Sequence, residues 1–399
     1  MTAGTNREPD GGGGPDRVRP PSATVARLRP YFRELGITRL ARQTNLDVLG
    51  IPCFAAIRPN SRSLACHYGK GISDDAAMVS AVMEAAEMAF AERAIPISFR
   101  GDAATLKDAG MQVFDVSRFL PFGETLADDA VIDWTAGRAL ASARPVMVPT
   151  DLLRMTGRAR GMAGLCQTSN GLAAGNIDAE AELHGLLELV ERDATTGWTL
   201  SMPDHRHARC FSIDSVDGPI VGDLAARVRR AGFVVSLFDL TNDIGIPTVM
   251  ALVGPADATH HREVTAGYAT HPLLARAVAG AVTEAAQSRL TLIAGARDDQ
   301  SPAAYDLPVH AEDAVLLGAS ARRNPPPDLG PVLPPDEALG LVLGALRAAS
   351  VADPVAVRLG GDCYGISVVR MLSEDLEDRG ANANWRPGAR SVSTLLRAA

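Results

Sequence analysis

The sequence lacks most of the patterns by which common protein classes are recognised. Its five cysteines are odd in number and form no Cys-x-x-Cys pair, so neither a disulfide framework nor a zinc site is indicated. No uncharged apolar run reaches the roughly 18 residues that a membrane helix needs. The N-terminus has neither the apolar core nor the cleavage site of a signal peptide. We therefore expect a cytoplasmic protein that does not enter a membrane.

Basic charge is also scarce. The chain carries 39 Lys and Arg against 47 Asp and Glu, a formal net charge of -8. Proteins that coat nucleic acids have a basic footprint instead, so we expect no nucleic-acid partner. A bound nucleotide remains compatible with this charge, because it needs only a local positive site. The eight histidines form no metal-binding motif, and neither a Walker A loop nor a Gly-x-Ser-x-Gly elbow occurs.

The composition is that of a globular protein. With 399 residues, 46% hydrophobic and 22% charged, the chain can bury a sizeable core. Residues 1–24 are rich in Gly, Pro and polar residues and predict a disordered tail, followed by one folded domain over 25–399. Periodicity predicts an α+β fold with helices at 73–93, 178–200 and 272–293, and strands at 51–57, 146–148, 233–238, 248–253, 355–359 and 366–372.

A short pattern recurs three times. An Asp precedes a Gly-Ile pair and an apolar run at Asp47–Ile51, Asp239–Ile246 and Asp362–Ile366. Gly and Asp are turn residues, so three ordinary hairpin turns explain the pattern. Duplicated structural units are the alternative.

The first predicted long helix carries carboxylates on one face. Ser80, Glu84 and Glu87 follow steps of four and three, and their neighbours are small and apolar rather than basic. Like charges at this spacing repel one another unless a cation is bound. A solvent-facing acidic stripe and a partly enclosed cation site both fit this helix alone.

The second long helix repeats the pattern. Glu180, His184, Glu188 and Glu191 follow steps of four, four and three along one face, and Arg192 comes next. A Gly-rich loop, 169–176, leads into this helix, and free N–H groups at a helix N-terminus favour an anion. Mg²⁺ takes oxygen ligands and commonly bridges one or two carboxylates and a phosphate. The two helices together therefore favour a Mg²⁺-nucleotide site.

Basic residues supply candidate counter-charges. Lys70 lies between Gly69 and Gly71, so its ammonium and its backbone can both approach a phosphate, although an ordinary hairpin loop fits the same residues. On the third predicted helix, Glu284 and Gln287 share a face from which Arg289 points away, and a plain amphipathic helix explains this nearly as well.

At these residues the chain resembles the YcaO family of ATP-dependent enzymes that modify peptide backbones. The resemblance runs in recognisable blocks from about residue 36 to 299 and more faintly to about 372. The blocks are Gly36–Ala41 with Thr44–Asp47 and Gly50–Pro52, Arg58–Ser63, Gly69–Gly71, Ser80–Glu87, Ser169–Asn176, Glu188–Asp193 and Glu284–Arg289.

The resemblance implies a fold in which long helices carry the ligands of ATP and Mg²⁺, which are the expected cofactors. The residues that match the family's ATP contacts are Lys70, Ser80, Glu84, Asn176, Glu188, Arg192, Gln287 and Arg289. Those that match its metal ligands are Glu84, Glu87, Glu180 and Glu191. No catalytic residue beyond these is assigned.

The resemblance also implies the reaction. A nucleophile adds to a backbone amide of a peptide or protein substrate, ATP phosphorylates the resulting oxygen, and phosphate leaves. Azoline-forming members end in a Pro-rich segment, whereas this chain ends Ser391–Ala399, and no leader-peptide-binding domain is visible before residue 36. We therefore expect the type that works with a TfuA-like partner and a sulfur donor to form thioamides.

Two alternatives stay open at this point. One is an azoline-forming cyclodehydratase that uses a separate partner protein, and the other is a non-catalytic accessory protein that binds ATP. The sequence does not determine the oligomeric state, and a homodimer is one expected form.

Overall fold

The computed structural model describes residues 17–158, 160–161, 163–297, 307–380 and 385–398. Within these ranges helices and strands mix in three sheets, so the predicted α+β class is confirmed. The predicted helices are confirmed closely: the second spans Asp178–Leu200, as expected. No helix of the described part of the chain is long and apolar enough to cross a bilayer.

The smallest sheet leads into the first long helix. Its order is β1-β2-β3, all antiparallel, and helix α2 packs on β3 and β2. Ser73 caps this helix, because its side chain accepts a hydrogen bond from the Ala76 N–H. The bounds are β1 Arg39–Arg42, β2 Cys53–Ile57, β3 Cys66–Lys70 and α2 Asp74–Ala91.

A four-stranded sheet has the same plan. Its order is β12-β11-β10-β9, again antiparallel, and helix α7 follows β12 and packs against it, while α6 packs on β10 and α7. The bounds are β9 Cys210–Phe211, β10 Phe233–Asp239, β11 Thr248–Pro255, β12 Thr265–Thr270, α6 Pro219–Arg230 and α7 Leu274–Ala294.

The third sheet has seven strands in the order β5-β7-β6-β13-β14-β8, with β4 beside β6 and only the β5–β7 pair parallel. Helix α4 packs on β8 and β14, and α9 packs on α4. The bounds are β4 Phe99–Gly101, β5 Gln112–Val113, β6 Ile132–Ala139, β7 Pro145–Pro149, β8 Leu172–Gly175, β13 Val355–Gly360, β14 Ser367–Leu372, α4 Asp178–Leu200 and α9 Pro335–Ala348.

Five shorter helices complete the described chain: α1 Pro21–Leu28, α3 Ala103–Asp108, α5 Pro203–His207, α8 Ala311–Leu317 and α10 Ala389–Ala398.

The recurring Gly-Ile pattern marks three equivalent places. It lies in the loops of the hairpins β1–β2, β10–β11 and β13–β14, so the hairpin interpretation is correct. Gly50, Gly245 and Gly365 all have positive φ, of 63°, 78° and 67°. In each case the second strand of the hairpin pairs with a strand that leads into a long helix, namely β3, β12 or β8. These hairpins therefore occupy equivalent places in three units of the same plan, so the two interpretations do not exclude each other.

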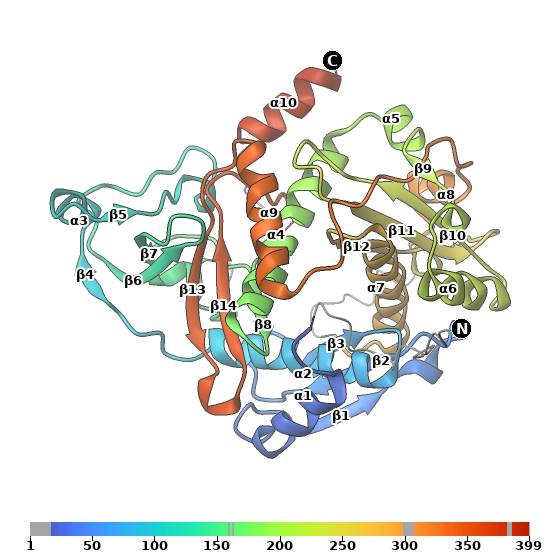
Figure 1. Cartoon of the computed structure of the whole chain (residues 1–399), viewed down its shortest axis with the longest axis horizontal. Helices are drawn as coiled ribbons and strands as arrows, with labels where there is room; N and C mark the ends of the chain where they lie inside the picture. Colours follow the sequence, from blue (N-terminus) through green and yellow to red (C-terminus); the bar gives the residue numbers. More distant parts are fainter. Residues whose placement is uncertain (1–16, 159, 162, 298–306, 381–384, 399) are drawn as a thin grey trace, which may run out of the picture.

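The long helices of these units converge (Figure 1). Each packs not only on its own sheet but also on a strand of the next unit: α2 against β8, α4 against β12 and α7 against β3. The first sheet lies at the bottom of Figure 1, the second at the right and the third at the left, so the helices meet between them. Residues far apart in the sequence are thereby brought to one place.

Glycines allow the helices to lie directly on the strands. A Cβ added at Gly69 would lie 2.0 Å from the Ala81 N, and one added at Gly267 would lie 2.2 Å from both the Ala281 O and the Ala285 N. At Gly175 it would lie 2.5 Å from the Ala181 N. The Gly-Lys-Gly sequence thus has a packing role in addition to the phosphate role that we expect for it.

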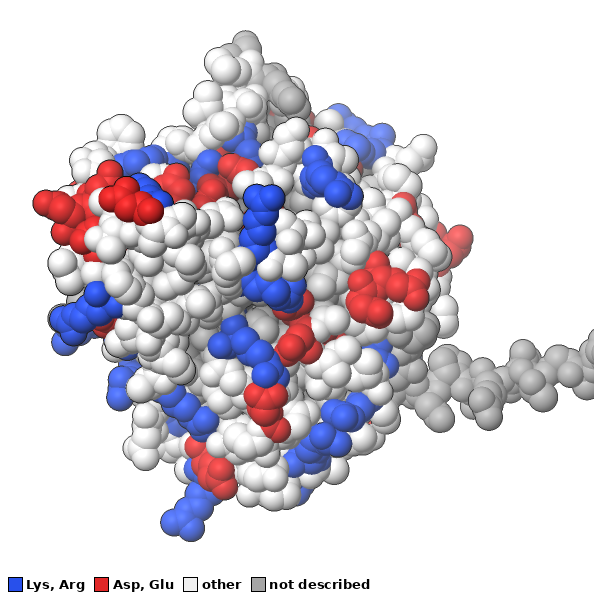
Figure 2. Space-filling view, turned by 60° about the vertical axis from the view of Figure 1, so that its left-hand side comes forward, with Lys and Arg blue, Asp and Glu red and all other residues white. Residues whose placement is uncertain are grey.

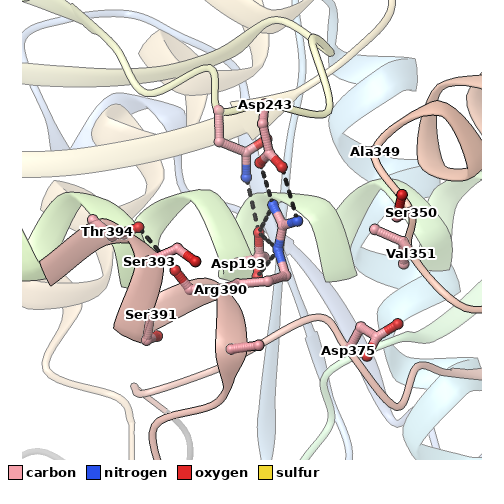
Figure 3. Close-up of a pocket in the computed structure, with 13 residues that line it drawn as sticks. Asp193, Asp243, Ala349, Ser350, Val351, Asp375, Arg390, Ser391, Ser393 and Thr394 are labelled. Atoms are coloured by element: carbon pink, nitrogen blue, oxygen red, sulfur yellow. Dashed lines mark hydrogen bonds and ion pairs between the residues drawn. The ribbon is translucent and has the colours of Figure 1, made fainter. Parts of the chain in front are cut away.

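The chain ends on a helix anchored to α4. Arg390 of α10 donates from Nε to both carboxylate oxygens of Asp193, at 2.9 and 3.0 Å, and from Nη2 to Asp243 at 2.6 Å. Asn242 donates to the same Asp193 carboxylate. These groups lie beside a cavity of about 280 Å³ (Figure 3).

The predicted N-terminal tail needs correction. Residues 1–16 lie outside the described part of the chain, but helix α1 already begins at Pro21. Its buried residues Thr24, Val25 and Leu28 pack it toward the first unit, where it contacts α2. Pro20 and Pro21 suit this helix start, because Pro lacks the N–H that the first helical turn leaves unbonded.

The close helix–strand contacts predict a sharp difference between glycines. Gly267→Ala should lower the free energy of unfolding by about 2–3 kcal/mol, because helix backbone atoms cannot move aside for a methyl group. Gly340→Ala in α9 is the matched control: nothing lies within 4 Å of the added Cβ, so it should stabilise by about 0.5–1 kcal/mol. Chemical denaturation of both variants checks this, and equal effects would contradict the packing role.

Candidate functional site

Carboxylates from three helices gather between the units. Helix α2 contributes Glu84 and Glu87, α4 contributes Glu188 and Glu191, and α7 contributes Glu284. Each of the five interacts electrostatically with at least one of the others, so they share one recess. On α2 the stripe of Ser80, Glu84 and Glu87 is partly exposed between fully buried alanines. Of the two alternatives that the sequence left open for this helix, the partly enclosed face fits the structure.

Backbone N–H groups hold several of these carboxylates. Glu87 accepts a hydrogen bond from the Ala174 N–H at 2.7 Å, and Glu188 accepts one from the Gly171 N–H at 3.0 Å. Asn176 donates in the same way to Glu180. All three donors lie in the Gly-rich segment that leads into α4. The sequence predicts that this loop offers free N–H groups to an anion. In the structure these three N–H groups already donate to carboxylates of the protein.

Two cations face the acidic cluster. Lys70, at the end of β3, forms an ion pair with Glu284 of α7 and so joins the first and second sheets. Arg192 lies 3.6 Å from Glu188 and 3.5 Å from Glu191. Burial alone would lower the pKa of Lys70, but the carboxylates, Glu284 foremost, raise it above its ordinary value. Lys70 is therefore a fixed positive charge in this recess.

The carboxylates outnumber these two cations, and the pKa values of four carboxylates are raised, with burial as the largest cause. Burial raises the pKa of Glu84 to about 7 and, with the neighbouring Glu284, that of Glu191 to about 8. Burial and the Glu84 and Glu188 charges raise the pKa of Glu87 well above its ordinary value. Burial also raises the pKa of Glu188, although Arg192 opposes it. The recess is short of positive charge.

This donor set matches a hard divalent cation. Its oxygens are carboxylates, which Mg²⁺ prefers, and added positive charge would relieve the repulsion that raises their pKa values. In their present positions no three His, Cys, Asp or Glu side chains of the described residues surround a single point closely enough to chelate an ion. A Mg²⁺ ion held here would therefore also use oxygens from outside the protein, such as those of a phosphate.

Glu180 and Asn176 lie at the N-terminal end of α4, and about two helical turns separate Glu180 from Glu188 of the acidic cluster. One Glu180 oxygen accepts from the Asn176 N–H and side-chain amide, and the other from the Val18 N–H at 2.7 Å. Asn176 in turn accepts a hydrogen bond from the Thr24 hydroxyl. His184 lies one turn along the same helix and is exposed.

The two expected ATP contacts on helix α7 point in different directions. Gln287 donates to the Tyr68 carbonyl of β3 at 3.4 Å and so lies near Lys70. Arg289, two residues on, points to another side of α7, where it forms a 2.8 Å ion pair with Asp47 and stacks over Phe233. The structure does not bring Arg289 together with the acidic cluster.

Sequence reasoning left out several groups that the structure places here. Glu284 was the easiest of them to predict, because its helical spacing to Gln287 already put both residues on one face. Arg370, on β14, and Asp378, which follows it, influence the pKa of Glu188, and Arg297 influences that of Glu84. No local pattern marks these three, since only the tertiary fold brings them near the helices.

A cavity of about 490 Å³ opens beside the acidic cluster. Glu188 and Arg192 form part of its wall, and the rest is polar: Ser169, Asn170, Thr195, Thr196, Thr199, Asp378, Arg379 and Gly380. On the face of the molecule shown in Figure 2, acidic and basic side chains are interspersed rather than gathered by sign.

Comparison with known proteins agrees with this geometry. The model of the family described as YcaO cyclodehydratase, ATP- and Mg²⁺-binding, matches residues 68–377. An uncharacterised protein in the tfuA 3' region of Rhizobium leguminosarum bv. trifolii is 35% identical over 95% of this chain and 93% of its own length. The predicted cofactors, ATP and Mg²⁺, are those of the family.

Solved structures share the fold at low sequence identity. A YcaO protein from Methanopyrus kandleri, bound with AMPPCP and Mg²⁺, superposes with a TM-score of 0.67 at 21% identity, over 94% of this chain and 96% of that one. A heterocyclase in complex with substrate and cofactor gives 0.72 at 19% identity over 91% of this chain. This chain spans about half the length of the heterocyclase, 53%.

The family model covers more than half of the chain, and the relative from the tfuA region covers nearly all of it. The chain therefore belongs to the YcaO family, whose activity is ATP-dependent peptide modification.

Proposed function

We propose that this protein uses Mg-ATP to activate a backbone amide of a peptide substrate by phosphorylating its oxygen. The convergence of five carboxylates from three helices around Lys70 and Arg192 carries the proposal, because these groups lack positive charge that Mg²⁺ would supply. The family's ATP and Mg²⁺ dependence supports it.

The residues divide by position. Glu84, Glu87 and Glu191 are the proposed Mg²⁺ ligands, with Glu188 beside them, and Ser80 faces the same recess from α2. Lys70 and Arg192 are the proposed phosphate contacts, and Gln287 lies near Lys70. Glu180 and Asn176, at the N-terminal end of α4, remain part of the proposed nucleotide site. Arg289 is not a proposed ATP contact. Its ion pair with Asp47 holds the adjoining hairpin loop instead.

This arrangement suits phosphoryl transfer. Such a reaction needs little covalent help from the protein, since positioning and charge neutralisation provide most of the acceleration. Bound Mg²⁺ would neutralise phosphate charge. The protein's own part is to hold Lys70 through Glu284 and to hold Arg192 between Glu188 and Glu191. Both cations are partly shielded from water, and in such surroundings charges act more strongly than in bulk solvent.

We propose thioamide formation as the outcome, with a TfuA-like partner and a sulfur donor. The relative that lies in a tfuA region, at 35% identity over nearly the full length of both chains, favours this type. Azoline formation is the second candidate, favoured by the family model's description as a cyclodehydratase and by the fold shared with the heterocyclase.

Mass spectrometry of a peptide encoded beside the gene, co-expressed with this protein and a TfuA-like partner, tests the outcome. A thioamide adds the mass difference between sulfur and oxygen, whereas an azoline or amidine loses one water. In parallel, the purified protein is assayed for ATP turnover with peptide, partner and sulfide. ATP that is bound but never consumed under any combination would refute catalysis and leave the accessory role.

The acidic cluster makes a direct prediction. Glu84→Gln and Glu191→Gln should each lower ATP turnover by about 100-fold or more, because each removes one proposed metal ligand without changing side-chain size. Glu182→Gln is the control on helix α4: this residue pairs with Arg138 away from the cluster, and turnover should stay within about twofold. Near-normal turnover in both cluster variants would return these carboxylates to a structural role.

The raised pKa values predict an unusual pH dependence of stability. Folded Glu84 and Glu191 keep their protons to about pH 7 and 8, whereas the unfolded chain loses them near 4.5. The folded state thus binds more protons between these limits, so the metal-free protein should lose stability as pH rises from about 5 to 8.

Thermal unfolding at intervals across that range measures the effect. Mg²⁺ with AMPPCP should stabilise the protein more at pH 8 than at pH 5.5, because binding must displace fewer protons there. The Glu84→Gln, Glu191→Gln double variant should show a flatter profile. A wild-type midpoint that rises over this range would contradict the charge assignment.

A further inference from the structure

The cavity of about 490 Å³ continues the line of proposed nucleotide contacts along helix α4. That line begins at Glu180, near the N-terminal end of the helix, and reaches Arg192 about three turns later. The cavity wall runs from Glu188 through Arg192 to Thr195 and Thr199, at steps of four, three and four, so one face of α4 forms it. The cavity therefore lies beyond the phosphate contacts, on the side away from Glu180.

This position is the one that a phosphate acceptor needs. In phosphoryl transfer the attacking oxygen approaches the terminal phosphate in line with the bond that breaks, from the side opposite the rest of the nucleotide. With the phosphates at Arg192, that side is the cavity. Ser169, Thr199 and Arg379 of its wall are exposed, whereas Glu188 and Arg192 are partly buried. The cavity thus connects the acidic cluster with solvent.

Hydrogen bonds hold the loop that carries Asn170, which forms part of the wall. On one side of this residue the Gly171 N–H donates to Glu188 at 3.0 Å. On the other side Arg370 donates to the Thr168 carbonyl. Asn170 is therefore held in a fixed relation to the acidic cluster, which lowers the entropy cost of binding a ligand there.

Two polar atoms of the wall residues lack a hydrogen-bond partner. The Asn170 Oδ1 and the Thr195 Oγ1 are shielded from water and are not hydrogen-bonded within the described part of the chain. Buried polar atoms without a partner are rare and cost free energy, so both side chains gain from a ligand that pairs with them. Because both residues line the cavity, a change of side-chain rotamer brings these atoms to a bound group.

The wall has the chemistry of a site for peptide backbone. Every described residue that lines the cavity is polar, charged or glycine, so these residues form no pocket for a large apolar side chain. A side-chain amide can accept a hydrogen bond from an N–H, and a hydroxyl can donate one to a carbonyl. These are the two groups that each peptide bond offers.

We propose that this cavity binds the substrate peptide, with Asn170 accepting a hydrogen bond from a backbone N–H and Thr195 donating one to a backbone carbonyl beside the amide that is phosphorylated. The inference rests on the proposed function and assigns the place where the peptide lies. Main-chain hydrogen bonds give affinity that does not depend on the neighbouring side chains. Contacts of this kind hold the amide at the phosphate.

Steady-state ATP turnover with the peptide encoded beside the gene, a TfuA-like partner and sulfide tests both residues. Asn170→Ala and Thr195→Val should each raise the KM for the peptide about tenfold, because a buried backbone group of the peptide loses its partner. The KM for ATP should stay within about twofold. Thr291→Val in α7 is the matched control: its hydroxyl donates to the Gln287 carbonyl of the same helix, and both KM values should stay within about twofold.

Modified peptides test the hydrogen bond to Asn170 directly. N-methylation removes one backbone N–H, and two peptides carry it singly at the bonds that flank the modified amide. One of them should lose about tenfold in kcat/KM with the wild type. With Asn170→Ala the same peptide should lose less than about twofold, because the partner of that N–H is already gone. Losses that simply multiply would show that Asn170 does not bind the peptide backbone.

The outcomes separate this inference from the proposed function. If the wild type consumes ATP with the peptide but Asn170→Ala and Thr195→Val match Thr291→Val, only the peptide site is overturned. If the two variants weaken AMPPCP binding and leave the KM for the peptide unchanged, the cavity belongs to the nucleotide and the inference fails. If the wild type binds Mg²⁺ and AMPPCP but never consumes ATP, both fall. A variant that fails to fold is detected by its thermal midpoint, and the other variant then decides.

Discussion

The crowding of buried carboxylates in one recess is the constraint on which this structure depends. Removing a charged carboxylate from water is costly, and placing several side by side adds repulsion. The protein offsets this with backbone N–H donors to Glu87 and Glu188, and with Lys70 and Arg192. These contacts do not suffice, since the pKa values of Glu84 and Glu191 remain near 7 and 8. The remaining deficit is what favours a bound cation.

The compensating contacts cross between the three units, which couples the site to the fold. Lys70 belongs to the first sheet but pairs with a helix of the second, and Glu87 of the first unit accepts from Ala174 in the third. Such contacts need closely packed helices and strands, and Gly69, Gly175 and Gly267 provide that proximity. A cation at the centre would therefore stabilise the arrangement of all three units, beyond its effect on individual side chains.

Local periodicity explains how much of this was predictable. Helix α4 and the acidic faces of α2 and α4 follow from residue spacing alone, because a helix places residues three and four apart on one side. The same rule could have added Glu284. It could not find Arg370 or Asp378, whose proximity to Glu188 depends on how β14 packs beside α4. The composition of residues 1–24 also misled, since helix α1 already begins at Pro21 and Thr24 is buried.

Glu180 shows why a motif match does not by itself assign a ligand. Its position puts it on the same face of α4 as Glu188 and Glu191, so the sequence alone does not distinguish the three. In the structure its oxygens accept three N–H hydrogen bonds, two from Asn176 and one from Val18, whereas Glu84 accepts none from the described residues. A carboxylate satisfied in this way has little need of a metal ion, while one with a raised pKa and no donor gains most from it. The proposed division between residues that organise the site and residues that would bind a cation thus follows from the hydrogen bonds that each carboxylate already accepts.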